Sequence, residues 1–204
     1  MSMTGEYYPE AVKELMEYFR RLPGIGRRGA ERLVVSLLEW PGEETAALGG
    51  ALGALHERIG KCPSCGAWSE NGKACRICSD PRRDASMLCV VETMPQLAAV
   101  ESSGKYNGRY LVLGGRISPL DDETGEGLNL KMLRDRVGSG EVSEVILALS
   151  SDVEGRATAV FLSEMLAAFP VKLTRPALGL PAGANLSYAD SATIGAAFAG
   201  RTGV

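Results

Sequence analysis

The chain has 204 residues, 45% of them hydrophobic, and a formal net charge of −3 at pH 7. This length accommodates one large domain or two to three small ones, and the apolar content is enough for buried cores. No apolar run approaches the roughly 18 residues of a membrane span, and the N-terminus lacks the basic start and apolar run of an export signal. We therefore expect a cytoplasmic protein without membrane contact. Because nucleic-acid binders are usually basic, the acidic balance argues against DNA binding over the whole surface, so any DNA contact requires a local basic cluster or several copies of one cluster brought together.

Three short amphipathic helices are predicted in the first 60 residues. The segments in which apolar residues recur at helical spacing are 9–22, 28–39 and 43–59. The residues on their apolar faces, which are expected to face the core, are Val12, Leu15, Met16, Phe19 and Leu22 in the first, Ala30, Leu33, Val34, Leu37 and Leu38 in the second, and Leu48, Leu52, Leu55 and Ile59 in the third. Pro23–Gly26 interrupts the pattern after the first segment, and Pro41-Gly42 interrupts it after the second. Three helices joined by short links predict a small helical module.

The link between the first two helices carries Gly24-x-Gly26-x-x-Gly29, which matches the dinucleotide-binding fingerprint letter for letter. That fingerprint requires a preceding strand, and this segment follows a helix, so we do not assign nucleotide binding to it. The order helix, Leu22-Pro-Gly-Ile-Gly26, helix instead resembles a helix-hairpin-helix DNA-binding motif. Glycines allow the backbone to approach a phosphate, and the N–H groups at the start of the second helix point toward the anion.

Basic side chains surround this hairpin. They are Arg20, Arg21, Arg27, Arg28 and Arg32, against a single acid, Glu31. Arg28 and Arg32 are four residues apart and therefore share one helix face. The predicted DNA-binding residues are Gly24, Gly26, Arg27, Arg28 and Arg32, and such phosphate contacts are independent of DNA sequence. The alternative is a solvated basic face on an ordinary helical hairpin.

Two Cys-x-x-Cys knuckles follow the helical module. Cys62 and Cys65 form the first, Cys75 and Cys78 form the second, and nine residues separate them. Two knuckles supply four thiolates to a tetrahedral Zn²⁺ ion, which leaves no coordination position for a reacting water. The spacing therefore predicts a structural zinc finger over residues 61–80. A redox pair would need one motif beside a βαβ pattern, and disulfides would need an oxidising compartment, so both alternatives fit less well.

After a polar linker at residues 80–84, apolar strand candidates alternate with helices. The predicted strands are 88–92, 109–113, 145–149 and 171–175, and the predicted helices are 95–101, 128–137 and 155–169, with a loop at 118–127. Such alternation with nearly continuous apolar strands indicates a parallel sheet covered on both faces. Cys89 lies in the first strand and is expected to be a small buried residue. The last stretch, with a short helix at 191–199, is expected to pack on the sheet domain or on a neighbouring subunit.

Acidic residues follow two of the predicted strands, namely Glu92 after one and Asp152 and Glu154 after another. In parallel sheets, ligands lie beyond the carboxyl ends of the strands. The pattern resembles a Toprim domain, in which such acids hold Mg²⁺, and carboxylates suit a hard cation. We predict at most a weak Mg²⁺ site, because acids at strand ends are common and Glu154 can instead cap the following helix. No nucleophile or general base accompanies the acids, which disfavours catalysis.

Over nearly its whole length, the chain resembles the bacterial RecR family of recombination mediators. The most specific runs are Leu22–Gly26, Cys75–Asp84, Leu113–Gly115 with Ser118–Asp121, Val153–Thr158, and Gly179–Asp190. The resemblance implies an α/β multi-module protein. Its modules are a helix-hairpin-helix module at 1–60, a four-Cys zinc finger at 61–80, a Toprim parallel-sheet domain at 81–176, and a small C-terminal packing or oligomerisation tail at 177–204.

The resemblance also implies a function. Members of the family are non-enzymatic DNA-repair proteins that form ring-like homotetramers, act with RecO and RecF, and help to load recombinase onto single-stranded DNA, so we expect a nucleoid-associated protein. By position, Arg28 and Arg32 match the family's two DNA-contacting basic residues, and Glu154 matches an acid linked to RecO contact.

The sequence departs from the family pattern at two places, and two alternative functions also remain possible interpretations. The gap between the knuckles is one residue longer than the family usually has, which is expected to reshape the zinc loop. Asp152 stands where a neutral residue is usual, which favours Mg²⁺. The alternative from the enzyme class is a Mg²⁺-dependent Toprim nuclease, or another phosphoryl-transfer enzyme, that uses Glu92, Asp152 and Glu154. The other is a protein-interaction module whose hairpin touches no DNA.

Overall fold

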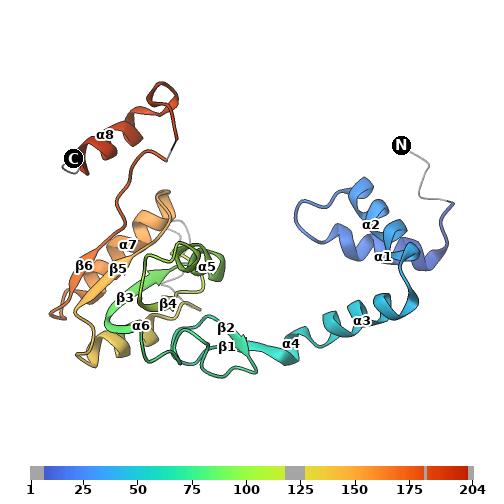
Figure 1. Cartoon of the computed structure of the whole chain (residues 1–204), viewed down its shortest axis with the longest axis horizontal. Helices are drawn as coiled ribbons and strands as arrows, with labels where there is room; N and C mark the ends of the chain where they lie inside the picture. Colours follow the sequence, from blue (N-terminus) through green and yellow to red (C-terminus); the bar gives the residue numbers. More distant parts are fainter. Residues whose placement is uncertain (1–6, 118–126, 182, 202–204) are drawn as a thin grey trace. The chain divides into compact units, whose positions relative to one another are not determined.

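The structure is a computed structural model that describes residues 7–117, 127–181 and 183–201. Its contacts divide the chain into two compact units, Met1–Arg58 and Ile59–Val204 (Figure 1). Most of the predicted loop at 118–127 lies outside the described residues. Within the described ranges, no helix is long and apolar enough to cross a membrane.

The first unit is helical. Its elements are α1 (Glu10–Arg20), α2 (Arg27–Glu39), α3 (Gly42–Gly53) and α4 (Leu55–Arg58). The first two helices confirm the prediction to within two residues at each end. The predicted third helix is divided, because α3 ends at the cap residue Ala54 and the short α4 follows it.

The core of the helical unit is smaller than the apolar pattern predicts. Among the described residues, four buried ones form it, Val12 and Met16 of α1 and Ala30 and Val34 of α2, and the partly buried Tyr8, Phe19 and Ile25 pack against them. Helix α3 buries none of its residues. Several residues that were expected to face this core are exposed instead: Leu15, Leu22, Leu33, Leu38, Leu52 and Leu55. The expectation fails for them because two short helices in contact shield only one narrow stripe of each, so the remaining apolar surface has no cover within this unit.

The second unit starts with a hairpin that the sequence analysis did not predict. Strands β1 (Ile59–Lys61) and β2 (Trp68–Glu70) pair antiparallel on either side of the first cysteine knuckle. The Cys62 N–H donates to the Ala67 carbonyl at 2.7 Å and closes the loop. Each strand has only three residues, too few to show the alternation by which strands are recognised.

The body of the second unit is a four-stranded parallel sheet in the order β4-β3-β5-β6. Its strands are β3 (Asp84–Val91), β4 (Gly108–Val112), β5 (Glu144–Leu147) and β6 (Lys172–Thr174), and the helices between them are α5 (Met94–Ser102), α6 (Leu130–Gly138) and α7 (Val153–Leu166). This confirms the predicted parallel α/β architecture. Strand β3 begins earlier than predicted, because Asp84 pairs with Gly108 of β4.

Side chains alternate between the two faces of the sheet, and both faces are buried. Leu88 and Val90 join a core with residues of α6 and α7. Cys89 and Val91 join a second core, which contains Leu97 of α5 and residues of the cysteine knuckles. Cys89 is 2% exposed and is a buried residue as predicted. One face is thus covered by α6 and α7, and the other is covered by α5 and the knuckles.

The first knuckle also covers the outer edge of β4. The Val112 N–H, which points away from β3, donates to the Cys65 carbonyl at 2.8 Å. The Asn129 side-chain amide donates to the Val112 carbonyl at 2.7 Å, and Arg136 Nη1 donates to the Ser64 carbonyl at 3.2 Å. Unpaired groups on an edge strand would otherwise be open to pairing with another chain. The knuckle is therefore part of the sheet unit.

The C-terminal tail contains the 3₁₀ helix η2 (Leu186–Tyr188) and α8 (Ser191–Ala199). Asp190 caps α8 by accepting a hydrogen bond from the Thr193 N–H at 2.9 Å. None of the residues of α8 is buried, so this helix keeps an uncovered surface.

Substitution of Gly66 provides a test of the contact between the first knuckle and the sheet. This glycine has a φ of +73°, and a Cβ there would lie 2.9 Å from the Val112 carbonyl oxygen and would also collide with the Asn129 side chain. Gly72, with a φ of +65°, would bring its Cβ no closer than 3.8 Å to the Lys61 carbonyl oxygen. We expect Gly72→Ala to cost about 1–2 kcal/mol for the left-handed backbone alone. Gly66→Ala should cost about 1–3 kcal/mol more for overpacking, as measured by denaturant unfolding of the metal-loaded protein. Equal losses for the two variants would contradict the close contact.

Candidate functional site

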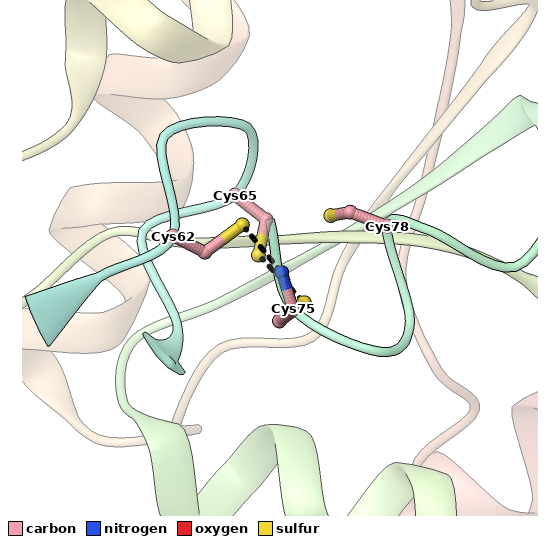
Figure 2. A group of neighbouring side chains, drawn as sticks. All are labelled: Cys62, Cys65, Cys75 and Cys78. Atoms are coloured by element: carbon pink, nitrogen blue, oxygen red, sulfur yellow. Dashed lines mark hydrogen bonds between the residues drawn. The ribbon is translucent and has the colours of Figure 1, made fainter. Parts of the chain in front are cut away.

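The four predicted cysteine ligands converge on one point (Figure 2). Their sulfur atoms all lie within 4.8 Å of one another, and the Cys65 and Cys75 sulfurs are 3.7 Å apart. A tetrahedral zinc site with metal–sulfur bonds of about 2.3 Å has sulfur–sulfur edges of about 3.8 Å. The cluster has nearly these dimensions, and it is the one group of metal-ligating side chains that the described residues form.

Local backbone structure positions these thiols. The Gly66 N–H donates to the Cys62 carbonyl at 2.9 Å, and the Ser79 N–H donates to the Cys75 carbonyl at 3.0 Å, so each knuckle is a tight turn. The Cys75 N–H also points at the Cys62 sulfur, at 3.4 Å. Because both turns lie against the sheet, Cys62 and Cys65 are fully enclosed, with exposures of 0% and 1%.

Electrostatics within the cluster favour a bound cation. Hydrogen bonding to Cys65 lowers the pKa of the Cys78 thiol to about 6, and Arg136 contributes to the same shift. The pKa of Cys65 is raised by the same hydrogen bond and by burial. Four sulfurs this close together, two of them buried and two half-buried, cannot all be anionic without a central positive charge. Since Zn²⁺ prefers thiolates in a closed tetrahedral set, Cys62, Cys65, Cys75 and Cys78 fit a structural zinc ion.

The predicted hairpin has the backbone of an anion site. Gly24 has a φ of +79° and turns the chain between α1 and α2. Gly26 is the N-cap of α2, and no side chain caps this end of the helix. The first N–H groups of α2 therefore have no partner within the helix, and no acidic residue lies in its first turn.

The predicted arginines differ in whether their side chains already have a partner in the structure. Arg20 is bonded to Glu17 at 2.5 Å, and Arg21 lies over the Tyr18 ring at 5.1 Å. The arginines that are exposed and have no ion-pair partner among the described residues are Arg27, Arg28 and Arg32. The acid among them, Glu31, accepts a hydrogen bond from the Tyr8 hydroxyl at 2.8 Å. Three free cations thus accompany the uncapped start of α2.

Glu92, the first predicted Toprim acid, is buried at the carboxyl end of β3. Its exposure is 3%. It accepts hydrogen bonds from the Ser150 N–H at 2.7 Å, the Ser150 hydroxyl at 2.7 Å and the Gln96 amide at 2.8 Å. This carboxylate therefore fastens the loop after β5 to the start of α5.

The other two acids lie nearby, and an arginine that the sequence analysis missed joins all three. Arg116 Nη1 donates to Asp152 at 2.5 Å, its Nη2 lies 3.1 Å from Glu154, and its Nε lies 4.0 Å from Glu92. Its position in the sequence could have revealed it. Arg116 follows β4, and because parallel strands end at the same edge of a sheet, it lies near the acids that follow β3 and β5. Within the described part of the chain, these acids do not form a metal-ligating group. Weak Mg²⁺ binding stays a prediction.

Asp152 has a structural role besides this ion pair. It is the N-cap of α7 and accepts a hydrogen bond from the Gly155 N–H at 2.8 Å. That bond, followed by the bond to Arg116, lowers the pKa of Asp152 below its usual value. The sequence predicts a helix that begins at Gly155, which would make Glu154 the capping residue. The helix instead begins at Val153, so Asp152 is its N-cap.

Comparison with known proteins assigns the family. Residues 12–56 match the family described as "RecR, helix-hairpin-helix", residues 86–177 match "Toprim domain", and residues 179–202 match "RecR, C-terminal". Recombination protein RecR of Bifidobacterium adolescentis is 44% identical over 197 residues, which cover 97% of this chain and 98% of the relative. The protein of the same name from Moorella thermoacetica is 45% identical over 195 residues, covering 96% and 98%. This chain belongs to the RecR family.

A third relative agrees with this assignment. Recombination protein RecR of Thermobifida fusca is 43% identical over 194 residues, which cover 95% of this chain and 97% of the relative. The RecR helix-hairpin-helix match falls within the first unit, and the Toprim match spans β3 to β6. The cysteine knuckles lie between the two matches, and the RecR family implies a role in recombinational repair.

Metal content provides a direct test of the cysteine cluster. We expect one zinc per chain, and we expect Cys75→Ser to lose it because three thiolates leave the ion incompletely coordinated. Metal binding in comparable sites supplies on the order of 10–16 kcal/mol of folding free energy, so the variant should unfold at a clearly lower temperature. Cys89→Ala, which removes a thiol outside the cluster, should retain full zinc. Elemental analysis and thermal unfolding measure both effects, and full zinc in Cys75→Ser would contradict the assignment.

Proposed function

We propose that this chain is a zinc-stabilised DNA-binding recombination mediator that contacts DNA through its hairpin and catalyses no reaction. The observation that carries the proposal is the coincidence of an uncapped helix start with free arginines. The first N–H groups of α2 and the side chains of Arg27, Arg28 and Arg32 all offer hydrogen bonds and positive charge. Phosphate oxygens are the matching ligand. Gly24 and Gly26 leave open space around the backbone, which allows close approach.

We further propose that several copies of the chain act together as a ring-like homotetramer. Two features support self-association. The helical unit exposes apolar residues that its own core does not cover, and α8 buries none of its residues. Contiguous exposed apolar surface commonly marks an interface. Assembly would also bring several arginine clusters together, so that one DNA molecule could contact more phosphates than a single cluster reaches.

We propose RecO and RecF as partners, and help in loading recombinase onto single-stranded DNA at the nucleoid as the outcome. The edge of the sheet with Arg116, Asp152 and Glu154 is the proposed contact for RecO. It combines both signs of charge in partly exposed side chains, with exposures of 36%, 54% and 45%. Mixed charges of this kind set specificity and orientation at protein interfaces.

The proposal that the chain catalyses no reaction is supported by the contacts of the Toprim acids, whose oxygens are already engaged within the chain. The oxygens of Glu92 are occupied by Ser150 and Gln96, and a guanidinium holds Asp152 and Glu154. A two-metal phosphoryl transfer would need these oxygens for metal ions. We expect no cleavage of end-labelled DNA by the purified protein in Mg²⁺ or Mn²⁺. Cleavage that disappears in Glu92→Gln would favour the nuclease.

The hairpin is tested by removing two of its free charges. We expect Arg28→Ala/Arg32→Ala to bind DNA more weakly and with a smaller salt dependence. Each lost phosphate contact should remove about 0.9 from the slope of log K against log salt on duplex and about 0.7 on single strands. Fluorescence anisotropy of a labelled oligonucleotide measures both quantities.

A matched control removes the same charge elsewhere. Lys131→Ala/Arg134→Ala takes two exposed positive charges from α6 in the second unit. Its affinity and salt slope should stay near those of the unmodified chain. If the two double variants behave alike, the hairpin is not the DNA contact. Native mass spectrometry of the same samples should give the mass of four chains, and a monomer at micromolar concentration would contradict the tetramer.

A further inference from the structure

A tryptophan stands exposed on the cysteine-knuckle module. Trp68, the first residue of β2, is 62% exposed, although tryptophan side chains are on average highly buried. Its cross-strand partner is Lys61, and residues opposite each other in an antiparallel pair share one face. An exposed ammonium group therefore lies on the same side of the hairpin as the indole.

A groove of about 750 Å³ lies between this hairpin, the second knuckle and α5. Its α5 side includes the apolar residues Leu97 and Ala98, and the other side includes Trp68, Lys73 and Arg76. The groove thus combines an aromatic ring and apolar walls with two long cationic side chains.

The free charges of this groove are positive. Within the described part of the chain, Lys73 and Arg76 are exposed and have no ion-pair partner. The acids of the groove are Glu70 and Glu101, and neither is without a partner. Glu101 is paired with Arg83 and accepts a hydrogen bond from the Tyr110 hydroxyl at 2.8 Å.

One buried polar group in the groove lacks a partner. The Ser69 hydroxyl is enclosed and has no hydrogen bond to any described residue, and Ser69 as a whole is 8% exposed. Ser69 also lines the groove. Buried hydroxyl groups are nearly always hydrogen-bonded, because an unmade bond is costly. Because Ser69 follows Trp68 in β2, its side chain points to the opposite face of the hairpin, so this enclosed oxygen is an unmatched polar atom beneath the groove and not a contact for DNA.

We propose that this groove binds single-stranded DNA, with one base stacked on Trp68 and the adjoining phosphates against Lys73 and Arg76. Unpaired bases stack on aromatic side chains, and cations follow the backbone beside them. Duplex DNA fits less well, because its bases are already stacked on one another. This inference rests on the proposed function for the class of ligand, namely DNA. It adds a DNA contact outside the helical hairpin of α1 and α2.

The test uses the fluorescence of Trp68. The chain has two tryptophans and six tyrosines, so Trp40→Phe leaves Trp68 as the only tryptophan, which is excited selectively at wavelengths where tyrosine does not absorb. Titration with unlabelled oligo(dT) should quench this emission in a saturable way, and a duplex of equal length should quench it less. Trp68→Ala should weaken oligo(dT) binding about five-fold or more, the effect of losing one base–aromatic stack. Lys73→Ala should also weaken binding, whereas Trp40→Phe should bind as the unmodified chain does. Zinc content verifies that each variant is folded.

The same titration in an Arg28→Ala/Arg32→Ala background separates this inference from the proposed function. Quenching of Trp68 at saturating oligo(dT) should persist there, because the groove does not involve the helical hairpin of α1 and α2. Unchanged Trp68 emission while anisotropy still reports binding would overturn the groove and leave the hairpin intact. Binding that ignores the two arginines but fails in Trp68→Ala would support the groove and exclude the hairpin. Equal quenching by duplex, or quenching only by a partner protein, would also contradict the proposal.

Discussion

The hydrogen bond from the Val112 N–H to the Cys65 carbonyl, 2.8 Å long, joins the cysteine cluster to the sheet, and the rest of the second unit depends on this joint. Strand β4 is an edge strand, and its outward N–H and C=O groups need partners. The first knuckle provides the partner for the N–H, and Asn129 provides the partner for the C=O. A metal ion bound by the four sulfurs, which lie within 4.8 Å of one another, would thereby also determine how one edge and one face of the sheet are covered.

The carboxyl edge of the same sheet is consistent with the proposal that this chain assembles with partners and catalyses no reaction. The Toprim acids are engaged in the protein's own structure, since Glu92 holds two loops together and Asp152 begins α7. Arg116 supplies the positive charge next to them. An acidic edge that is partly balanced by an arginine of the same chain can present a stable pattern of charge to a partner.

Much of this architecture could be predicted from the sequence, and the exceptions have physical causes. The spacing of Cys62, Cys65, Cys75 and Cys78 was sufficient because a tetrahedral ion needs that arrangement, and the apolar strands were long enough to show their period. The hairpin of β1 and β2 was not predictable, since it is held by the knuckle between its strands and not by its own pattern. Arg116 was missed because a long side chain reaches acids that are distant in sequence. Leu15 and Leu33 were predicted to be buried because periodicity shows which face is apolar, but not whether a neighbour covers it.

The most direct test of the account is hydrogen exchange of the Val112 amide in the zinc-loaded protein and in the protein after chelation. Leu113 is the control, because its N–H bonds to Val91 inside the sheet at 2.8 Å. The account predicts that removal of zinc greatly accelerates exchange at Val112 and accelerates it much less at Leu113. Protection of Val112 that survives complete loss of metal, or a natively folded protein that never contained metal, would contradict it.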